Sequence, residues 1–287
     1  MRFTDLSATE STEGRKEAKA DIEQLSRSWD WHVRRKVAWC PDAPAAVLET
    51  LSRDPNQWVR EAVAGNERTP AAALARLAED SSGYVRAAVA LNRRATSEIL
   101  ASLAEDEMVD YDSTLQKNRY LVKESVAKSP NVGPETLASL ACDSDEHVRA
   151  AAAGNPLLSP ESMGRMVRDV FWEVRNNIAK NPSTPEELLL RLSGDQIMDV
   201  RATIAKNPRT PPAALAALAG DRSWEIKEAL AGNASLDGSI LAELAGHWSW
   251  MVRAAVAGNP NTPAGTLRLL ADDPDQSVQK AARSRLR

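Results

Sequence analysis

The sequence predicts an all-α solenoid of about ten two-helix repeats, and three periodic features support this prediction. A Val or Ile followed by a basic residue recurs every 26 residues. Paired Leu residues follow these positions at 15 and 18 residues, and Asn-Pro and Thr-Pro pairs separate the apolar runs. A fixed period of about 20 to 50 residues is typical of repeat proteins, whose short units bury their apolar faces against each other.

The first helix of each repeat, helix A, is expected to begin after an Asp, Asn or Ser that lies three positions before the Val. Such a side chain can accept a hydrogen bond from a free N–H group of the first turn. An Asn-Pro pair should then end the helix, because the residue before a proline avoids the α conformation. The repeated apolar positions are Val33, Val59, Val85, Val122, Val148, Val174, Val200, Ile226 and Val252, with a degenerate copy at Val278.

The second helix, helix B, is expected to begin at the Thr-Pro pairs, with Thr as N-cap and Pro as the first helical residue. The clearest examples start at Thr69, Thr184, Thr210 and Thr262. The paired Leu residues of helix B should face the core, and one copy has Met163 and Met166 instead. Neither helix is long enough to be stable alone, so packing between repeats must supply the stability.

An Asp recurs 21 positions after the Val in eight copies, in phase with the basic column. We expect these residues to form a ladder of Asp–Arg pairs that orients neighbouring repeats. The alternative is that the Arg column binds phosphate. The ladder is favoured, because a polyanion site would not place a carboxylate beside each cation.

One insertion of 11 residues interrupts the period, at about residues 107–117. Ser113 and Gln116 have the spacing of a capping box, so we expect helix A of this repeat to extend toward its N-terminus behind a protruding loop. Two interpretations remain open for this segment, a tolerated surface insertion and a specificity element for a basic partner.

Composition excludes several classes of protein. With 36 Lys and Arg against 40 Asp and Glu, the 287-residue chain has a net charge of −4, which argues against a general polyanion binder. No run of about eighteen apolar residues and no apolar leader occurs, so we expect no membrane span, no signal peptide and a cytoplasmic location. Residues 1–15 are expected to be a flexible segment, followed by one solenoid domain over residues 16–287.

The repeat unit Val-Arg-x-x-Val-Ala-x-Asn-Pro-x-Thr-Pro-x-x-x-Leu-x-x-Leu-Ala-x-Asp, clearest from Val200 to Asp221, resembles the leucine-rich-repeat variant (LRV) proteins, bacterial relatives in style of HEAT and armadillo solenoids. The resemblance covers about residues 16–287. It implies a right-handed superhelix of alternating short helices, one set of them 3₁₀-like, with no sheet. A member of that family holds an iron–sulfur centre on an N-terminal cysteine cluster, but Cys40 and Cys142 are too few for one, so no cofactor and no metal are expected here.

The positions two, three and six residues after the Val are small in many copies, as at Ala62, Gly65, Ala229 and Gly232. They share one face of helix A, opposite the core-facing arc. Small residues there are compatible with tight packing on the inner side of a curved stack, and also with the floor of an open groove. Repeat proteins bind partners along such concave surfaces, so this face predicts a protein or peptide partner.

Tryptophan residues near the start of helix A are the second candidate feature. They could pack over small residues where repeats meet, or they could anchor a partner, because Trp supplies a large contact area at little entropic cost. The candidate partner-binding residues are Trp31, Trp58, Trp172, Asn176, Asn177, Lys180, Lys206, Trp224 and Trp250.

Catalysis has little support in the sequence. His32, His147 and His247 lie in different repeats, and no metal-ligand, Cys–His or nucleophile motif is present. We therefore predict a non-enzymatic, cytoplasmic, monomeric scaffold that binds a protein or peptide partner. The alternative is a nucleic-acid-binding solenoid, with or without DNA-glycosylase-like activity, that uses the Lys, Asn and Trp residues of the central repeats.

Overall fold

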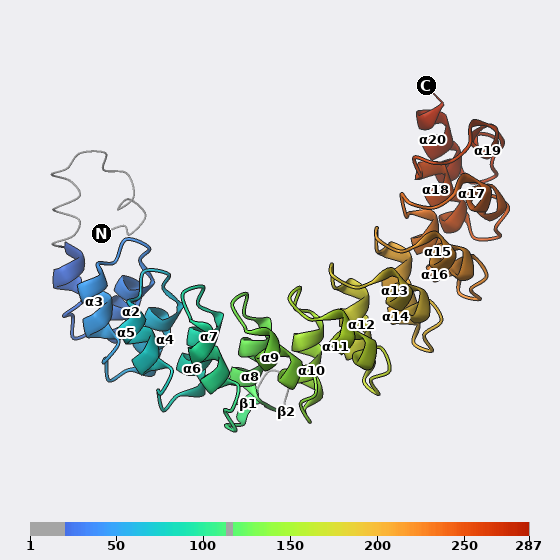
Figure 1. Ribbon diagram of the computed structural model, residues 1–287. Coiled ribbons are helices and arrows are strands. Elements are labelled where there is room, and N and C mark those ends of the chain that lie inside the picture. The colour runs from blue at the N-terminus through green and yellow to red at the C-terminus, as the bar shows by residue number, and fades with distance from the viewer. Residues whose placement is uncertain (1–20, 113–116, 287) are drawn as a thin grey trace. The chain divides into compact units, whose positions relative to one another are not determined.

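The computed structural model describes residues 21–112 and 117–286 as alternating short helices (Figure 1). Helices A and B alternate along the chain, as the period predicts, and the described helices are all α-helical. The predicted all-α repeat solenoid is therefore confirmed. The expected 3₁₀ character of one helix set is wrong, while the right-handed coil stays a prediction.

The chain divides after Asn155 into two compact units. Unit 1 contains residues 1–155 and unit 2 contains residues 156–287. The flexible segment expected over residues 1–15 lies outside the described residues. The single continuous domain expected over residues 16–287 stays a prediction.

Besides the helical residues 21–25, unit 1 contains five A helices and four B helices among its described residues. The A helices are α2 (Trp31–Trp39), α4 (Gln57–Gly65), α6 (Gly83–Leu91), α8 (Leu121–Lys128) and α10 (Glu146–Ala153). The B helices are α3 (Ala45–Leu51), α5 (Ala71–Leu77), α7 (Ser97–Leu103) and α9 (Pro134–Leu140).

Unit 2 contains five helices of each kind among its described residues. The A helices are α12 (Trp172–Lys180), α14 (Met198–Lys206), α16 (Trp224–Ala231), α18 (Trp250–Gly258) and α20 (Gln276–Arg285). The B helices are α11 (Pro160–Met166), α13 (Glu186–Leu192), α15 (Pro212–Ala219), α17 (Gly238–Leu244) and α19 (Ala264–Leu270).

The core follows the predicted columns. In helix A the Val and the apolar residue four positions later are buried, as Val200 and Ile204 show in α14. In helix B the paired Leu residues are buried, as Leu215 and Leu218 show in α15. Successive A helices pack directly on each other through both units. The seven-residue B helices gain their stability from this packing, because an isolated helix of that length does not form in water.

The insertion folds differently from the expectation. Residues Asp110–Asp112 (β1) and Lys117–Arg119 (β2) form an antiparallel pair, so the expected absence of any sheet is wrong at this point. The register places Asp110 opposite Arg119, Tyr111 opposite Asn118 and Asp112 opposite Lys117. Helix α8 begins only at Leu121, so the expected extension of helix A is also wrong. The capping box expected at Ser113 and Gln116 lies outside the described residues.

The base of the hairpin is fixed to α8 by an ion pair. The Arg119 guanidinium donates two hydrogen bonds to Glu124, whose carboxylate is only 2% exposed. Lys128, one turn further along α8, lies 3.7 Å from the same carboxylate. The hairpin therefore compensates a buried charge on α8, since an unpaired carboxylate at that depth would be strongly unfavourable.

The Thr of the Thr-Pro pairs does not cap helix B. In α5 the N-cap residue is Pro70, and no side chain caps the helix. The hydroxyl of Thr69 instead donates to the carbonyl oxygen of Val63 at the end of helix A, and Thr210 makes the same contact with Ile204 at 2.6 Å. The buried hydroxyl therefore ties the loop back onto helix A, because its own donor must be satisfied away from water.

Asn residues at the end of helix A join consecutive repeats. The side-chain Nδ2 of Asn259 donates to the carbonyl oxygens of Ala231 and Asn233 in the preceding repeat, at 2.7 and 2.8 Å. Its side-chain oxygen accepts from the backbone N–H of Asn261. The same column bridges repeats at Asn66, Asn92, Asn155, Asn207 and Asn233. These amides satisfy carbonyl groups that the end of helix A would otherwise leave without a partner.

Candidate functional site

The predicted Asp–Arg ladder forms one edge of each unit. Arg175 donates two hydrogen bonds to Asp195, at 2.6 and 2.9 Å, and two more to the carbonyl oxygens of Asp169 and Val170. Ladder pairs of the same kind are Arg34–Asp54, Arg60–Asp80, Arg86–Asp106, Lys123–Asp143, Arg201–Asp221 and Arg253–Asp273. Each of these seven basic groups is thus engaged by its carboxylate, which leaves them poorly suited to hold phosphate.

The pKa values of four ladder carboxylates, those of Asp80, Asp195, Asp221 and Asp273, lie below the usual value. Burial raises the pKa of Asp221, but hydrogen bonds from Arg201 and the backbone N–H of Ser223, with the charges of Arg201 and Lys227, bring the pKa below its usual value. For Asp273 the hydrogen bond from Arg253 is the largest influence, and it also lowers the pKa. A carboxyl whose pKa is lower in the folded state contributes stability above its unfolded pKa, and this stability is lost as the pH falls.

We therefore expect the ladder to weaken in acid. At about pH 6, Asp221→Asn should lower the free energy of unfolding by about 1 kcal/mol, the scale of a partly exposed ion pair. As the pH falls below about 4, where Asp is protonated in the unfolded chain, the gap between wild type and variant should close. Thermal denaturation at several pH values measures this gap, and a gap that stays constant down to about pH 3 would contradict the ladder's electrostatic role.

A hollow lies on the A-helix face of unit 2, which we define as the side of α14, α16 and α18 that carries the small residues. Its volume is about 510 Å³. The floor consists of small side chains, and the charged residues Lys206, Glu225 and Glu228 border it. The residues that line the hollow are Ala202, Lys206, Glu225, Glu228, Ala229, Gly232, Asn233 and Ala255.

The small residues of this face are not required by the backbone. A Cβ atom added to Gly232 would make only ordinary contacts of 3.5 Å or more, and one added to Gly258 would meet nothing within 4 Å. The backbone would therefore accept larger side chains at Gly232 and Gly258, and the open surface results from the small residues present there. Of the two interpretations, tight packing and an open groove, unit 2 shows both, since its A helices pack directly and still leave this hollow.

A second hollow of about 510 Å³ lies at the start of α12 and α14 in unit 2. Its lining includes Trp172, the ladder pair Arg175 and Asp195, and two further cations, Arg168 and Arg191. Val170 and Ile197 supply exposed apolar surface at its border. This hollow therefore combines an aromatic ring, exposed aliphatic groups and positive charge.

The predicted site residues of unit 2 lie on more than one surface. Lys206 borders the hollow of the A-helix face, whereas Trp172 lines the second hollow. Asn176 is buried, and its side-chain oxygen accepts a hydrogen bond from the hydroxyl of Thr203 at 2.6 Å, so its amide links two A helices. Lys180 is exposed at the end of α12. The remaining predicted residues of unit 2 are Asn177 and Trp224, which are half-buried, and Trp250, which is exposed.

In unit 1 the predicted residues Trp31 and Trp58 are half-buried. The Trp31 ring stacks on His32 with 3.8 Å between ring centroids. Trp58 lies 5.7 Å from the Tyr84 ring, and the guanidinium of Arg35 lies 5.8 Å from the Trp58 ring. These contacts fit the packing interpretation of the two rings, and their role toward a partner stays a prediction.

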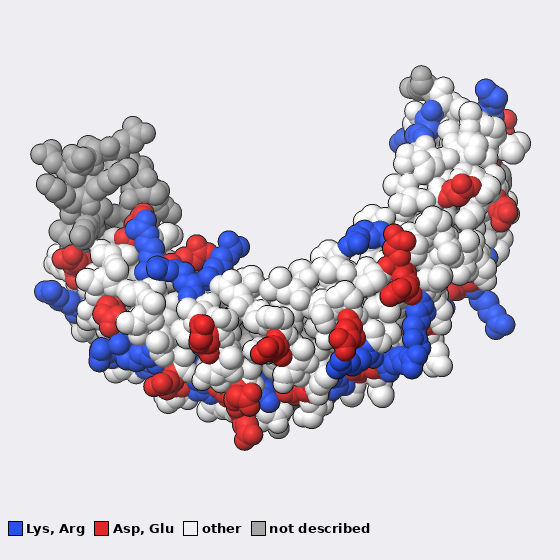
Figure 2. Space-filling model, in the orientation of Figure 1, with Lys and Arg blue, Asp and Glu red and all other residues white. Residues whose placement is uncertain are grey.

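Lys206 and Trp172 line different hollows and Asn176 is buried, and a common basic aromatic patch of the central Lys, Asn and Trp residues stays a prediction. Both signs of charge occur in each unit on the face shown in Figure 2. The sequence reasoning missed Glu225 and Glu228, which border the first hollow, and Arg191, which lines the second. Glu225 and Glu228 lie one position before and two positions after Ile226. Their positions within the repeat could therefore have placed them beside the small residues of helix A.

Further features bear on cofactors and membranes. Within residues 21–112 and 117–286, no group of three or more His, Cys, Asp and Glu side chains is arranged to hold a metal ion. Cys40 and Cys142 are free thiols. None of the helices in the described part of the chain has the length and apolar character needed to span a membrane.

Stacked pairs of short helices, joined by Asn and Asp–Arg columns and open on one face, define an α-helical repeat protein of the solenoid type. Residues 58–82, 198–223 and 250–275 match the model of the family described as Leucine rich repeat variant. These three repeats and the fold make the chain a helical repeat protein of the leucine rich repeat variant type. No curated protein sequence matches the chain.

Among solved structures, one described as a leucine-rich repeat variant with a novel repetitive protein structural motif is similar to this chain. Its TM-score is 0.56 at 24% sequence identity, over 86% of this chain and 89% of that chain. An engineered protein matches with a TM-score of 0.35 at 17% identity, over 97% and 95% of the two chains. The Escherichia coli protein YibA matches with a TM-score of 0.42 at 16% identity, over 91% and 97%.

Proposed function

We propose that the protein is a non-enzymatic scaffold that binds a protein or peptide partner along the A-helix face of unit 2. The observation that carries this proposal is the hollow of about 510 Å³ over Ala202, Ala229, Gly232 and Ala255. A floor of small side chains lets a partner's backbone approach closely, and surrounding charges can fix its orientation. Solenoids present extended surfaces of this kind to their partners.

The charges around the hollow indicate what it selects. Glu225 and Glu228 border it with one cation, Lys206, so the rim has more negative than positive charge. Glu225 also accepts a hydrogen bond from the hydroxyl of Ser223 at 2.6 Å, which restrains its carboxylate. A partner segment with small or apolar residues and a basic side chain fits this rim by charge complementarity.

Two observations support a binding role over a catalytic one. Neither hollow of unit 2 is lined by His, Cys or Ser, the side chains that most often act as nucleophile or base. The carboxylates of the ladder are committed to their Arg partners. The free thiols of Cys40 and Cys142 support a reducing, cytoplasmic location, and the proposed scaffold acts there as a monomer.

The proposal is tested with peptides selected from a random displayed library against the full-length protein. Ala255→Arg places a long side chain in the hollow and should weaken the selected peptides at least about tenfold. Ala217→Arg is the matched control, because Ala217 is exposed on helix α15 and the charge change is the same. Isothermal titration calorimetry measures both affinities, with circular dichroism as the check on folding.

Either of two results would overturn the proposal: selection yields no binding peptide, or the two variants bind alike. Nucleic acid provides a further comparison. Tight binding of single-stranded DNA or RNA at about 50 mM salt that falls a hundredfold or more at about 200 mM would support the alternative function. We expect no such binding.

A further inference from the structure

A column of large apolar residues runs along the N-terminal ends of the A helices in unit 2. It lies two positions before the repeated Val or Ile and consists of Trp172, Met198, Trp224 and Trp250. The side chains beside it are strongly exposed, 89% for Val170 and 76% for Trp248. Ser223 Oγ lies 3.6 Å from Met198 Sδ, which shows that the ends of α14 and α16 are direct neighbours. We name this surface, with its column and flanking residues, the apolar edge.

Two helices of the apolar edge have an apolar residue at the N-cap position, where most other A helices have an Asp, Asn or Ser. Phe171 and Ile197 occupy the N-cap positions of α12 and α14, and neither helix has a side-chain cap hydrogen bond. In unit 1, Asp30 and Asn56 fill the same position and do cap their helices. An Asp, Ser or Asn cap stabilises a helix by about 1 kcal/mol, and the apolar residues Phe171 and Ile197 cannot supply that stabilisation. Such a departure from local rules is typical of a functional surface.

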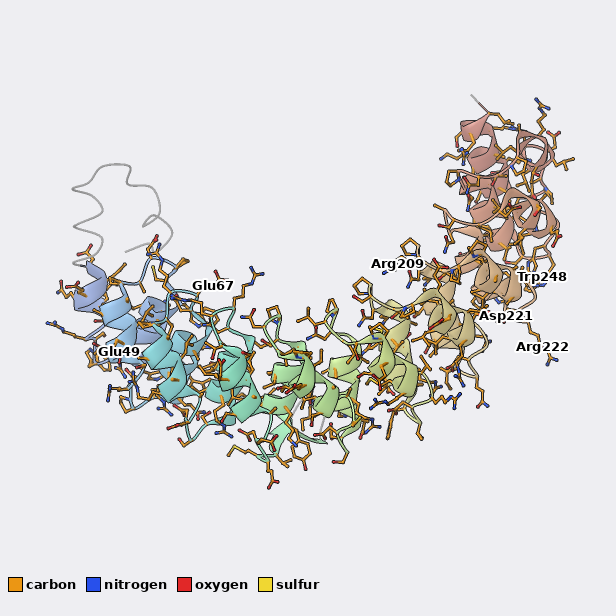
Figure 3. The ribbon with its side chains drawn as sticks, in the orientation of Figure 1. Glu49, Glu67, Arg209, Asp221, Arg222 and Trp248 are labelled. Carbon is orange, nitrogen blue, oxygen red and sulfur yellow. The ribbon has the colours of Figure 1, made fainter. Side chains whose placement is uncertain are left out.

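The apolar edge also carries cations that no carboxylate of the described chain neutralises. Arg168, Arg191 and Arg222 are exposed and have no ion pair within residues 21–112 and 117–286. Arg175 and Arg201, by contrast, are paired with their ladder carboxylates. Figure 3 shows Arg222 and Trp248 on the same side of the repeats.

The carboxylates near these helix ends do not cancel that charge. Asp195 and Asp221 belong to the ladder and are hydrogen bonded to Arg175 and Arg201. Asp169, which also lines the second hollow, accepts a hydrogen bond from the N–H of Phe171 and has a further partner within the chain. Glu225 lies in the first turn of α16 but lines the hollow of the A-helix face. Its equivalents one position before the Val, Glu173 and Asp199, do not line the second hollow. The apolar edge therefore favours an acidic partner.

The spacing of the column indicates the conformation of that partner. Packed helices lie about 8 to 10 Å apart, so the column presents one large apolar residue at roughly that interval. A polyproline II segment advances about 9 Å per turn of three residues, so the same face of the peptide returns once per repeat. Aromatic-lined grooves bind proline-rich segments by this match, and a Trp indole N–H can donate to the peptide's free carbonyl groups.

The indole groups of the apolar edge are free to donate in this way. Within the described residues, the Nε1–H groups of Trp172, Trp224, Trp248 and Trp250 have no hydrogen-bond acceptor, and none of them is buried without a partner. A polyproline II backbone has no internal hydrogen bonds, so its carbonyl groups are available.

We infer that the apolar edge of unit 2 binds an extended, acidic, proline-rich segment of a partner protein. The acidic residues meet Arg168, Arg191 and Arg222, and the proline rings lie between the apolar side chains of successive repeats. This surface is separate from the A-helix face, so the inference does not depend on the proposed function.

The test measures fluorescence anisotropy of a labelled peptide of about twelve residues with the repeating unit Pro-Pro-Glu, added to the full-length protein. We expect saturable binding, and at least about tenfold weaker binding to Trp248→Ala and to Arg191→Glu. Both side chains are exposed, so the variants keep the fold. The matched control is Trp29→Ala in unit 1, which removes an equally placed Trp that is 95% exposed and should leave the affinity unchanged.

Two further peptides separate the contributions of charge and conformation. A peptide with the unit Pro-Pro-Lys should not bind, because its charges repel the unpaired Arg groups, and one with the unit Gly-Ser-Glu should bind at least about tenfold more weakly, because it is not preorganised. The inference is overturned by an acidic proline-rich peptide that does not bind, by equal binding of the basic peptide, or by equal losses in Trp29→Ala and Trp248→Ala. Ala255→Arg should bind this peptide normally, which separates the apolar edge from the A-helix face.

Discussion

Replacing Asn259 by Ala is expected to lower the free energy of unfolding by about 3 kcal/mol. The substitution removes the Nδ2 hydrogen bonds to the buried carbonyl groups of Ala231 and Asn233 and the acceptor of the Asn261 N–H. The Asn233 carbonyl keeps its hydrogen bond from the N–H of Leu236. Carbonyl and N–H groups left without a partner away from water cost about 1 to 3 kcal/mol each, and relaxation recovers part of that sum. Chemical denaturation of the full-length protein measures the loss.

The neighbouring Asn261 provides the matched control. Its side chain also donates to two carbonyl groups of the preceding repeat, those of Ala234 and Leu236, at 2.7 and 3.2 Å, but it is exposed. Water can replace these bonds in Asn261→Ala, so the expected loss is about 0.5 kcal/mol. Equal losses in the two variants would show that burial of the Asn column does not hold the repeats together.

The second large effect is expected in helix B. Leu215→Ala should lower the free energy of unfolding by about 3 kcal/mol, because Leu215 is only 1% exposed and its truncation leaves a cavity between repeats. Met163 occupies the equivalent buried position in α11, so Met163→Leu should cost less than about 1 kcal/mol. Thermal denaturation of both variants tests whether the Met and Leu positions are equivalent, and a cost for Met163→Leu as large as that for Leu215→Ala would refute it.

The periodic part of the fold could be predicted because the same packing positions recur in the sequence of every repeat. The Val, Leu and Asp–Arg columns each recur in phase. A repeat in which one column is degenerate can therefore still be assigned from the other repeats. The hairpin of Asp110–Asp112 and Lys117–Arg119 occurs once, so it had no repeated signal, and a capping pattern at Ser113 suggested a helix instead.

The Asn column shows how a correct observation led to an incomplete interpretation. Asn before Pro explains the end of helix A by local sterics alone. Asn66, Asn92 and Asn233 hold the same position without a following Pro, which indicates a role for the side chain itself. That role is the bridge to the preceding repeat, a long-range contact that a single repeat cannot reveal.

The predicted site residues Trp172 and Lys206 line different hollows because of their place on the helical wheel. Two positions before the Val, a residue lies almost as close to the ladder Arg as to the small residues, so Trp172 lines a hollow with Arg175. Trp58 stands one position before its Val and contacts Arg35, which occupies the small-residue position two residues after Val33. Sequence periodicity gives the position of a residue within its repeat. The surface on which its side chain lies depends on the packing of the neighbouring repeats.

The central claim, that the A-helix face of unit 2 is a partner-binding surface, is tested most directly by methyl NMR of the full-length protein labelled at alanine. A peptide selected for binding is added, and the methyl signals of A and B helices are compared. The account predicts shifts for Ala202, Ala229 and Ala255 and none for the exposed Ala213, Ala216 and Ala217 of α15. Shifts confined to the α15 methyl groups, with the A-helix signals unchanged, would contradict it.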